Sequence, residues 1–193
     1  MKRLIGWLVV LIVLAAGAGF WWVRSYRPLE AGPVFGTVGA TFRHGTIQAS
    51  ERPIYARVLD YRHGEEVATY FSIRNAGPFA VTVEGIEDLP VPPEDFDGLL
   101  SFIEARMGRG NGEVDPGETV PLSPFSLGSG EERLVLLRWR FDNCRGWDPD
   151  DTLSGSRHEI GYRVMGLSRS ATIELPGAWA VEGPPADECP GGG

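Results

Sequence analysis

The sequence is poor in the residues and motifs that enzymes use for catalysis. Its 193 residues include only three histidines, His44, His63 and His158, and none of them has the H-E-x-x-H or paired spacing of a zinc site. The G-x-S-x-G pattern of a serine nucleophile is also absent. These absences predict a protein that is not an enzyme. A carbohydrate-active enzyme with two carboxylates stays open as an alternative, because any two of the 26 acidic residues can meet in space.

Positive charge is sparse outside the first 28 residues. The chain has a net charge of −8. All 26 acidic residues follow position 29, where they outnumber the 14 basic residues of the same region. The region after residue 29 therefore carries a net charge of −12. Because such a surface repels phosphate backbones, we expect no nucleic-acid partner.

The N-terminus carries one long apolar segment. Leu4 to Val23 is an uncharged run of 20 residues, which as a helix spans about 30 Å, the thickness of the hydrocarbon core of a bilayer. Lys2 and Arg3 precede it, so the positive-inside rule favours a cytoplasmic N-terminus. We expect an uncleaved single-pass anchor in the cell membrane, with the rest of the chain outside the cytoplasm. A secretory signal cleaved after Ala18 is the alternative, and it exports the same domain.

The two cysteines, Cys144 and Cys189, agree with export. They lie 45 positions apart, and the chain has no C-x-x-C pair. An even pair in an oxidising compartment predicts a disulfide, which the loop-closure model values at about 4 kcal/mol. Two free thiols or a metal site are the alternatives.

The exported region is patterned as strands and turns. Its many glycines and prolines fit short strands better than long helices, and the spacing of turns is typical of a β-sandwich with about seven to nine strands. Arg133 to Phe141 is the strongest strand, and its apolar face should belong to the core. That face consists of Val135, Leu137, Trp139 and Phe141. Further strands are expected at 54–59, 67–75, 79–86, 119–122, 125–127, 158–165, 170–175 and 179–181.

Two local patterns lead to more specific predictions. A turn signal at Asn75 to Pro78 joins the strands at 67–75 and 79–86, which predicts a hairpin-like pair. Apolar residues from Leu99 to Ile103 have helical spacing, which predicts a short helix that ends at Gly108.

The pattern divides the chain into four parts. We expect an anchor over residues 1–27, a juxtamembrane linker over 28–36, an Ig-like β-sandwich over 37–183, and a loose tail over 184–193 that is tied down by Cys189.

Two stretches of the expected sandwich resemble known sequences. YFSIRNAGPFAVTVEGI (70–86) resembles the strand-turn-strand of many bacterial Ig-like envelope domains. PFSLGSGEERLVLLRWRFDNC (124–144), followed by IGYRVMGLSRSATIEL (160–175) and a terminal cysteine, is similar to uncharacterised membrane-anchored Ig-like extracytoplasmic proteins of high-GC Gram-positive bacteria. The resemblance implies an Ig-like fold outside the membrane, and it supplies no active site.

One acidic loop has the composition of a cation site. Asn111, Glu113, Asp115 and Glu118 place oxygen atoms at near-alternate positions around glycines, as Ca²⁺ prefers, although the spacing departs from the EF-hand. The alternative is a polar hairpin loop in which Asp115 and the following Pro and Gly make the turn.

These features together predict a non-catalytic, membrane-tethered Ig-like domain. Its expected partners are the membrane, through residues 4–23, and an envelope protein or surface polymer. The alternatives are a calcium-binding structural or sensing domain that uses residues 111–118, and the carbohydrate-active enzyme.

Overall fold

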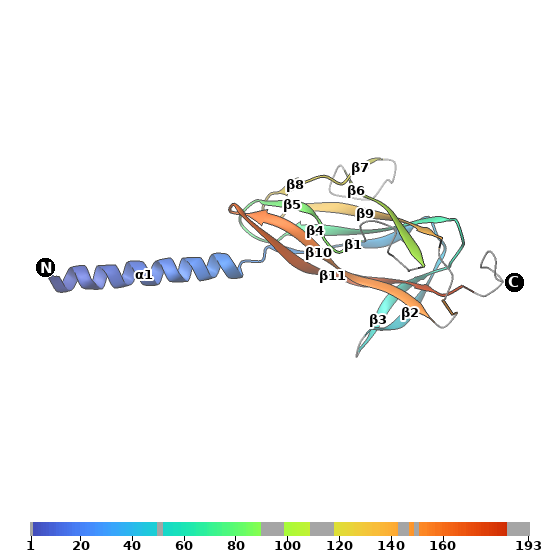
Figure 1. Ribbon diagram of the computed structural model, residues 1–193, viewed down its shortest axis with the longest axis horizontal. Coiled ribbons are helices and arrows are strands. Elements are labelled where there is room, and N and C mark those ends of the chain that lie inside the picture. The colour runs from blue at the N-terminus through green and yellow to red at the C-terminus, as the bar shows by residue number, and fades with distance from the viewer. Residues whose placement is uncertain are drawn as a thin grey trace.

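A computed structural model describes residues 2–49, 52–89, 99–108, 118–142, 147–148 and 151–184. These residues contain one long helix followed by eleven strands (Figure 1). The elements are α1 (Lys2–Ser25), β1 (Leu29–Val38), β2 (Phe42–Ala49), β3 (Arg52–Leu59), β4 (Glu66–Asn75), β5 (Val81–Ile86), β6 (Leu100–Gly108), β7 (Thr119–Pro121), β8 (Phe125–Leu127), β9 (Glu132–Phe141), β10 (Thr152–Val164) and β11 (Leu167–Glu182).

The strands form two sheets with a shared core. The five-stranded sheet has the order β1-β4-β9-β6-β7, and the six-stranded sheet has the order β2-β3-β11-β10-β5-β8. Paired strands are antiparallel, except for β3 and β11, which run parallel where residues 56–59 meet 178–181. Buried side chains from both sheets form the main hydrophobic core. The predicted all-β, sandwich-like architecture is therefore confirmed.

The alternation predicted for residues 133–141 is present in β9, the central strand of the five-stranded sheet. Val135, Leu137 and Phe141 are fully buried, and Trp139 is 5% exposed. The burial of one such side chain contributes about 1.5–3 kcal/mol to stability. The period-two pattern therefore identified the core face of this strand correctly.

The outer face of β9 carries ion pairs. Arg138 binds both Glu66 of β4 and Glu104 of β6, and Arg140 binds Glu66 at 2.8 Å. Hydrogen bonds from Arg140 and Arg138 lower the pKa of Glu66 below its ordinary value. Because these groups are exposed to water, they contribute little to the free energy of unfolding.

The helix predicted over residues 99–103 is wrong. Leu100 begins β6, which pairs with β9 along its length. The register shifts between Phe102 and Glu104, so Ile103 is an additional residue in the strand. Such a bulge breaks the alternation of apolar residues, and the broken pattern imitates helical spacing.

The hairpin-like pair predicted for 67–75 and 79–86 is also wrong. β4 pairs with β1 and β9 in one sheet, whereas β5 pairs with β10 and β8 in the other. Asn75, which is fully buried, stabilises the connection between the two sheets. Its amide nitrogen donates to the carbonyl oxygens of Phe79 at 2.8 Å and Leu127 at 3.0 Å. Its amide oxygen accepts from the backbone N–H of Gly77 at 3.0 Å. The turn signal is real, but it connects two sheets.

The segment expected to be a juxtamembrane linker, 28–36, lies mostly in β1, which pairs with β4. Residues 170–175 and 179–181, expected as two strands, belong to the single strand β11. Pro176 lies between them, and because proline lacks an N–H group it indicated a break in the sequence pattern.

The N-terminal helix α1 is present and comprises 24 residues. In the described part of the chain, no helix combines the length and the apolar character needed to cross a membrane. The predicted disulfide residues Cys144 and Cys189 lie outside the described residues, as do Asn111, Glu113 and Asp115 of the predicted cation loop.

Candidate functional site

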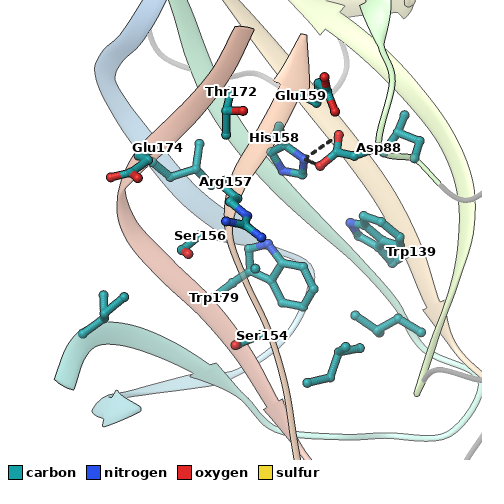
Figure 2. A pocket seen from close by; sticks show the side chains of 16 residues that line it. Asp88, Trp139, Ser154, Ser156, Arg157, His158, Glu159, Thr172, Glu174 and Trp179 are labelled. Carbon is teal, nitrogen blue, oxygen red and sulfur yellow. Dashed lines mark hydrogen bonds and ion pairs between the residues drawn. The ribbon is translucent and has the colours of Figure 1, made fainter. Parts of the chain in front are cut away.

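A cavity of about 1180 Å³ lies beside β10 and β11 (Figure 2). Asp88, just after β5, lies on one side, and Trp139 of β9 and Trp179 of β11 supply aromatic walls. The other polar residues that line it are Ser154, Ser156, Arg157, His158, Glu159, Thr172 and Glu174.

An irregularity in the strand pairing creates this opening. Gly155 of β10 pairs with Trp179, but Arg157, two residues later, pairs with Glu174. Residues 175–178 of β11 therefore have no partner on β10, and from Ala178 onward β11 pairs with β3. Bulges of this kind separate strands and redirect side chains next to functional sites.

Asp88 and His158 form an ion pair or charge-assisted hydrogen bond at one wall of the cavity. The Nδ1 atom of His158 lies 3.2 Å and 3.4 Å from the two carboxylate oxygens (Figure 2). The imidazole is 6% exposed and stacks on the Phe71 ring at 4.7 Å between centroids. Burial alone would raise the pKa of Asp88, but the hydrogen bond and charge of His158, together with backbone groups, lower it below its ordinary value.

Two buried nitrogen atoms of residues that line the cavity have no hydrogen-bond partner among the described residues. They are Nε2 of His158 and Nε1 of Trp179. The neighbouring Trp139, by contrast, donates from its Nε1 to Thr69 at 3.2 Å. An unpaired buried polar group lowers stability by about 1–3 kcal/mol, so each of the two is unusual in a folded protein.

The two nitrogens can both pair with a hydroxyl group. When Nδ1 of His158 lies against Asp88, Nε2 accepts a hydrogen bond in the neutral imidazole and donates one in the protonated imidazole. The indole Nε1–H of Trp179 can only donate. A hydroxyl group, which both donates and accepts, can therefore pair with either nitrogen.

Glycine at position 155 is required by the close approach of Trp179. A Cβ atom at this position would lie 2.6 Å from two carbon atoms of the indole and 2.7 Å from its Nε1. The indole therefore packs directly on the backbone of β10. Any side chain at position 155 would displace Trp179 from the cavity wall.

The described residues of the cavity form neither a catalytic triad nor a metal-binding group. His158 has no nucleophilic hydroxyl in hydrogen-bond contact with Nε2 in the described residues, so no Ser-His-Asp arrangement is formed there. The pKa of Asp88 is lowered, so this carboxyl does not have the raised pKa that the general acid of a glycoside hydrolase needs; the carboxylates of Glu159 and Glu174 also line the cavity. Within the same residues, no three His, Cys, Asp or Glu side chains form a group that could hold a metal ion.

The residues singled out in the sequence do not form this site. Glu118, the one described member of the predicted cation loop, is exposed just before β7 and does not line the cavity. Ca²⁺ binding and the disulfide stay predictions. His158 was expected only to begin a strand, and its pairing with Asp88 was missed because the two lie 70 positions apart.

Comparison with known proteins gives no family. No protein-family model matches the chain, and no curated protein matches it. Among solved structures, it is similar to the ASH/PapD-like domain of human CEP192 (PapD-like domain 7), with a TM-score of 0.32 and 9% identity over 72% of this chain and 92% of that one. It is also similar to the Pseudomonas fluorescens alkylpurine DNA glycosylase AlkC bound to DNA containing an abasic site analogue, with a TM-score of 0.27 and 14% identity over 77% of this chain and 30% of that one. Similarities this weak carry no functional argument, so the architecture described above rests on the strand pairing itself.

Proposed function

We propose that this protein is a non-catalytic, membrane-tethered Ig-like module that lies outside the cytoplasm and binds a hydroxyl-rich segment of an envelope polymer. The observation that carries the proposal is the pair of buried, unpartnered nitrogens, Nε2 of His158 and Nε1 of Trp179, in residues that line one cavity. Both atoms are closed to solvent in this structure, and ligand hydroxyls that reach them as the surrounding side chains move would satisfy both groups. The hydroxyls of Ser154, Ser156 and Thr172 offer further hydrogen bonds along the same walls.

The tether is supported by the surface of α1. Four consecutive residues, Leu11 to Leu14, are between 59% and 63% exposed, and Trp7 and Trp21 are more than 70% exposed. Four consecutive residues point in different directions around a helix, so one groove of a protein partner cannot cover them all. A bilayer surrounds a helix on every side. The uncharged run from Leu4 to Val23 has the length that this requires.

Binding of saccharides by the full-length protein in lipid nanodiscs tests the proposal. The probes are an array of soluble oligosaccharides and polysaccharide fragments, followed by calorimetric titration of those that are retained. Trp179→Phe removes the free N–H group and keeps an aromatic ring, so we expect a loss of affinity of about tenfold, the value of one hydrogen bond. Trp139→Phe is the matched control, because the N–H group of Trp139 is already bonded to Thr69.

Three results would contradict this function. Retention of no saccharide would remove the ligand class, and equal affinities of the wild type and the Trp179→Phe variant would remove the cavity as the site. Release of shortened sugars during the titration would favour the carbohydrate-active enzyme instead. Recovery of the full-length chain in the soluble fraction, without nanodiscs, would remove the tether.

A further inference from the structure

The turn between β10 and β11 holds a methionine in an unfavourable backbone conformation. Met165 has φ of 50° and Gly166 has φ of 78°, and Val164 pairs with Leu167 across them. This is a two-residue hairpin turn of the type that favours Asn, Asp or Gly at both central positions. Met165 is the one non-glycine residue with positive φ in the described chain, and its side chain is 42% exposed. An exposed apolar residue at a strained position points to a function for that side chain.

Two more apolar side chains are exposed near the same end. Leu167 follows the turn and is 46% exposed, and Phe79 is 44% exposed. Phe79 also contacts the last turn of α1 edge-on, at 6.0 Å from the Trp22 ring. Figure 1 shows the β10–β11 turn at the end of the sandwich from which α1 leaves. We call this surface the helix-proximal end; it consists of Arg24, Arg27, Phe79, Met165, Leu167 and Arg169.

The helix-proximal end is basic, although the domain as a whole is acidic. Arg24, Arg27 and Arg169 surround a hollow of about 430 Å³. No acidic residue among those that the structure describes lines this hollow, whereas the region after residue 29 carries a net charge of −12. Arginines beside exposed apolar side chains match the surface of a membrane, where the apolar groups enter the interface and the cations meet anionic headgroups.

The joint between α1 and the sandwich is short and held by hydrogen bonds. Three residues separate the end of α1 at Ser25 from the start of β1 at Leu29. Arg169 donates to the carbonyl oxygens of Arg24 at 2.9 Å and Tyr26 at 3.1 Å. The helix-proximal end is therefore fixed in orientation relative to α1.

We propose that the helix-proximal end docks on an anionic phospholipid surface, with Met165 and Leu167 inserted at the interface, and so fixes how the sandwich stands on the membrane. The proposal rests on the tether proposed above. A bilayer is the favoured occupant because the exposed Trp22 ring of α1 contacts the exposed Phe79 ring of this end, so the two form one apolar surface.

The test uses the full-length chain in nanodiscs of phosphatidylcholine and phosphatidylglycerol, spin-labelled near the headgroup. A fluorescent amino acid replaces Leu167 in one sample and Tyr55, 57% exposed on β3, in the control. We expect several-fold stronger quenching at position 167 than at position 55. Met165→Asn, which suits the turn and removes the apolar tip, should reduce quenching at 167 while the protein stays bound to nanodiscs.

The outcomes separate docking from tethering. A chain that elutes with nanodiscs but is quenched equally at both positions overturns the docking and leaves the tether intact. A chain that does not elute with nanodiscs overturns the tether, and the docking with it. Discs of phosphatidylcholine alone should weaken quenching at 167, and equal quenching in both lipids would contradict the role of the arginines.

Discussion

The two cavity tryptophans allow a direct test of which indole lacks a partner. Trp139 and Trp179 are 5% and 6% exposed, and their rings lie 6.1 Å apart. Replacement of either by Phe removes a similar volume from a similar environment, so the loss of packing should be comparable. The polar contributions differ, because only Trp139 donates to Thr69.

The expected difference in the free energy of unfolding between the two variants follows from this hydrogen bond. Trp139→Phe removes a hydrogen bond and leaves the hydroxyl of Thr69, which is 2% exposed, without this donor. That loss is about 1–3 kcal/mol beyond the loss of packing. Trp179→Phe removes an N–H group that has no partner among the described residues. It should therefore lower the free energy of unfolding only by the loss of packing, or by less, because the cost of the unpaired group is also removed. We expect Trp139→Phe to be the less stable variant by about 1–3 kcal/mol.

Urea unfolding of the two variants, followed by far-ultraviolet circular dichroism in one detergent, gives the comparison. Thr69→Val, alone and combined with each tryptophan variant, completes two double-mutant cycles. Coupling to Thr69 should appear with Trp139 and be absent with Trp179. Equal stabilities of the two variants, or coupling of Thr69 to Trp179, would refute the assignment on which the proposed ligand site depends.

Two further predictions concern the turn after β4 and the Asp88 pair. Gly77→Ala should lower the free energy of unfolding by more than about 1 kcal/mol, because its Cβ would lie 1.8 Å from the hydroxyl of Tyr26. Gly85→Ala is the control, because no atom lies within 4 Å of the new Cβ. Similar unfolding midpoints for both variants would contradict the close approach of Tyr26 to Gly77. The second change is Asp88→Asn. Because the folded pKa of Asp88 lies below its ordinary value of 3.8, the carboxylate stabilises the fold above that pH, and its contribution disappears as the pH falls through the folded pKa. The difference in unfolding midpoint between wild type and variant should therefore shrink in acid, and a difference that stays constant from neutral pH to about pH 3 would contradict the pairing.

The sequence predicted those strands whose alternation is regular. In β9 one face is apolar at every second position, and the structure buries all four of those side chains. In β6 the alternation of apolar residues is interrupted, because one additional residue at Ile103 shifts the register. Periodicity describes a strand only while its register is unbroken, and a bulge cannot be recognised without the partner strand.

β1 was missed for another reason. Pro28 and Pro33 argue against continuation of the N-terminal helix and so predicted a linker, but in the structure Gly32 and Gly36 make room for side chains of the neighbouring strand. A Cβ at Gly32 would lie 2.2 Å from the hydroxyl of Ser72, and a Cβ at Gly36 would lie 2.2 Å from the hydroxyl of Tyr70. Proline excludes a helix in this segment but is compatible with an edge strand, and β1 is the edge strand of its sheet.

The candidate site could not be predicted from the chain alone. Asp88 follows β5 and His158 lies in β10, and they meet because these strands pair in the register that places Ile86 opposite Ile160. The strand predicted from the sequence begins at His158, whereas β10 begins at Thr152, so Gly155 lay outside the predicted strand and gave no indication of a bulge. Which side chain approaches Gly155 depends on the partner strand β11 and on its unpaired residues 175–178.

The position of the cavity along β10 bears on what can reach it. Met165 lies seven positions after His158, which corresponds to about 23 Å along an extended strand. Even if β10 were tilted by about 45°, the cavity would stand about 16 Å above the turn. Headgroups extend only about 5–8 Å beyond the hydrocarbon core, so with Met165 at the interface His158 lies outside the lipid layer. A short, hydrogen-bonded joint at Arg169 would keep this height constant. The docking of one end and the binding at the cavity then have a common consequence: the site meets molecules that lie just beyond the membrane surface, as an envelope polymer does, and does not meet the lipids on which the domain stands.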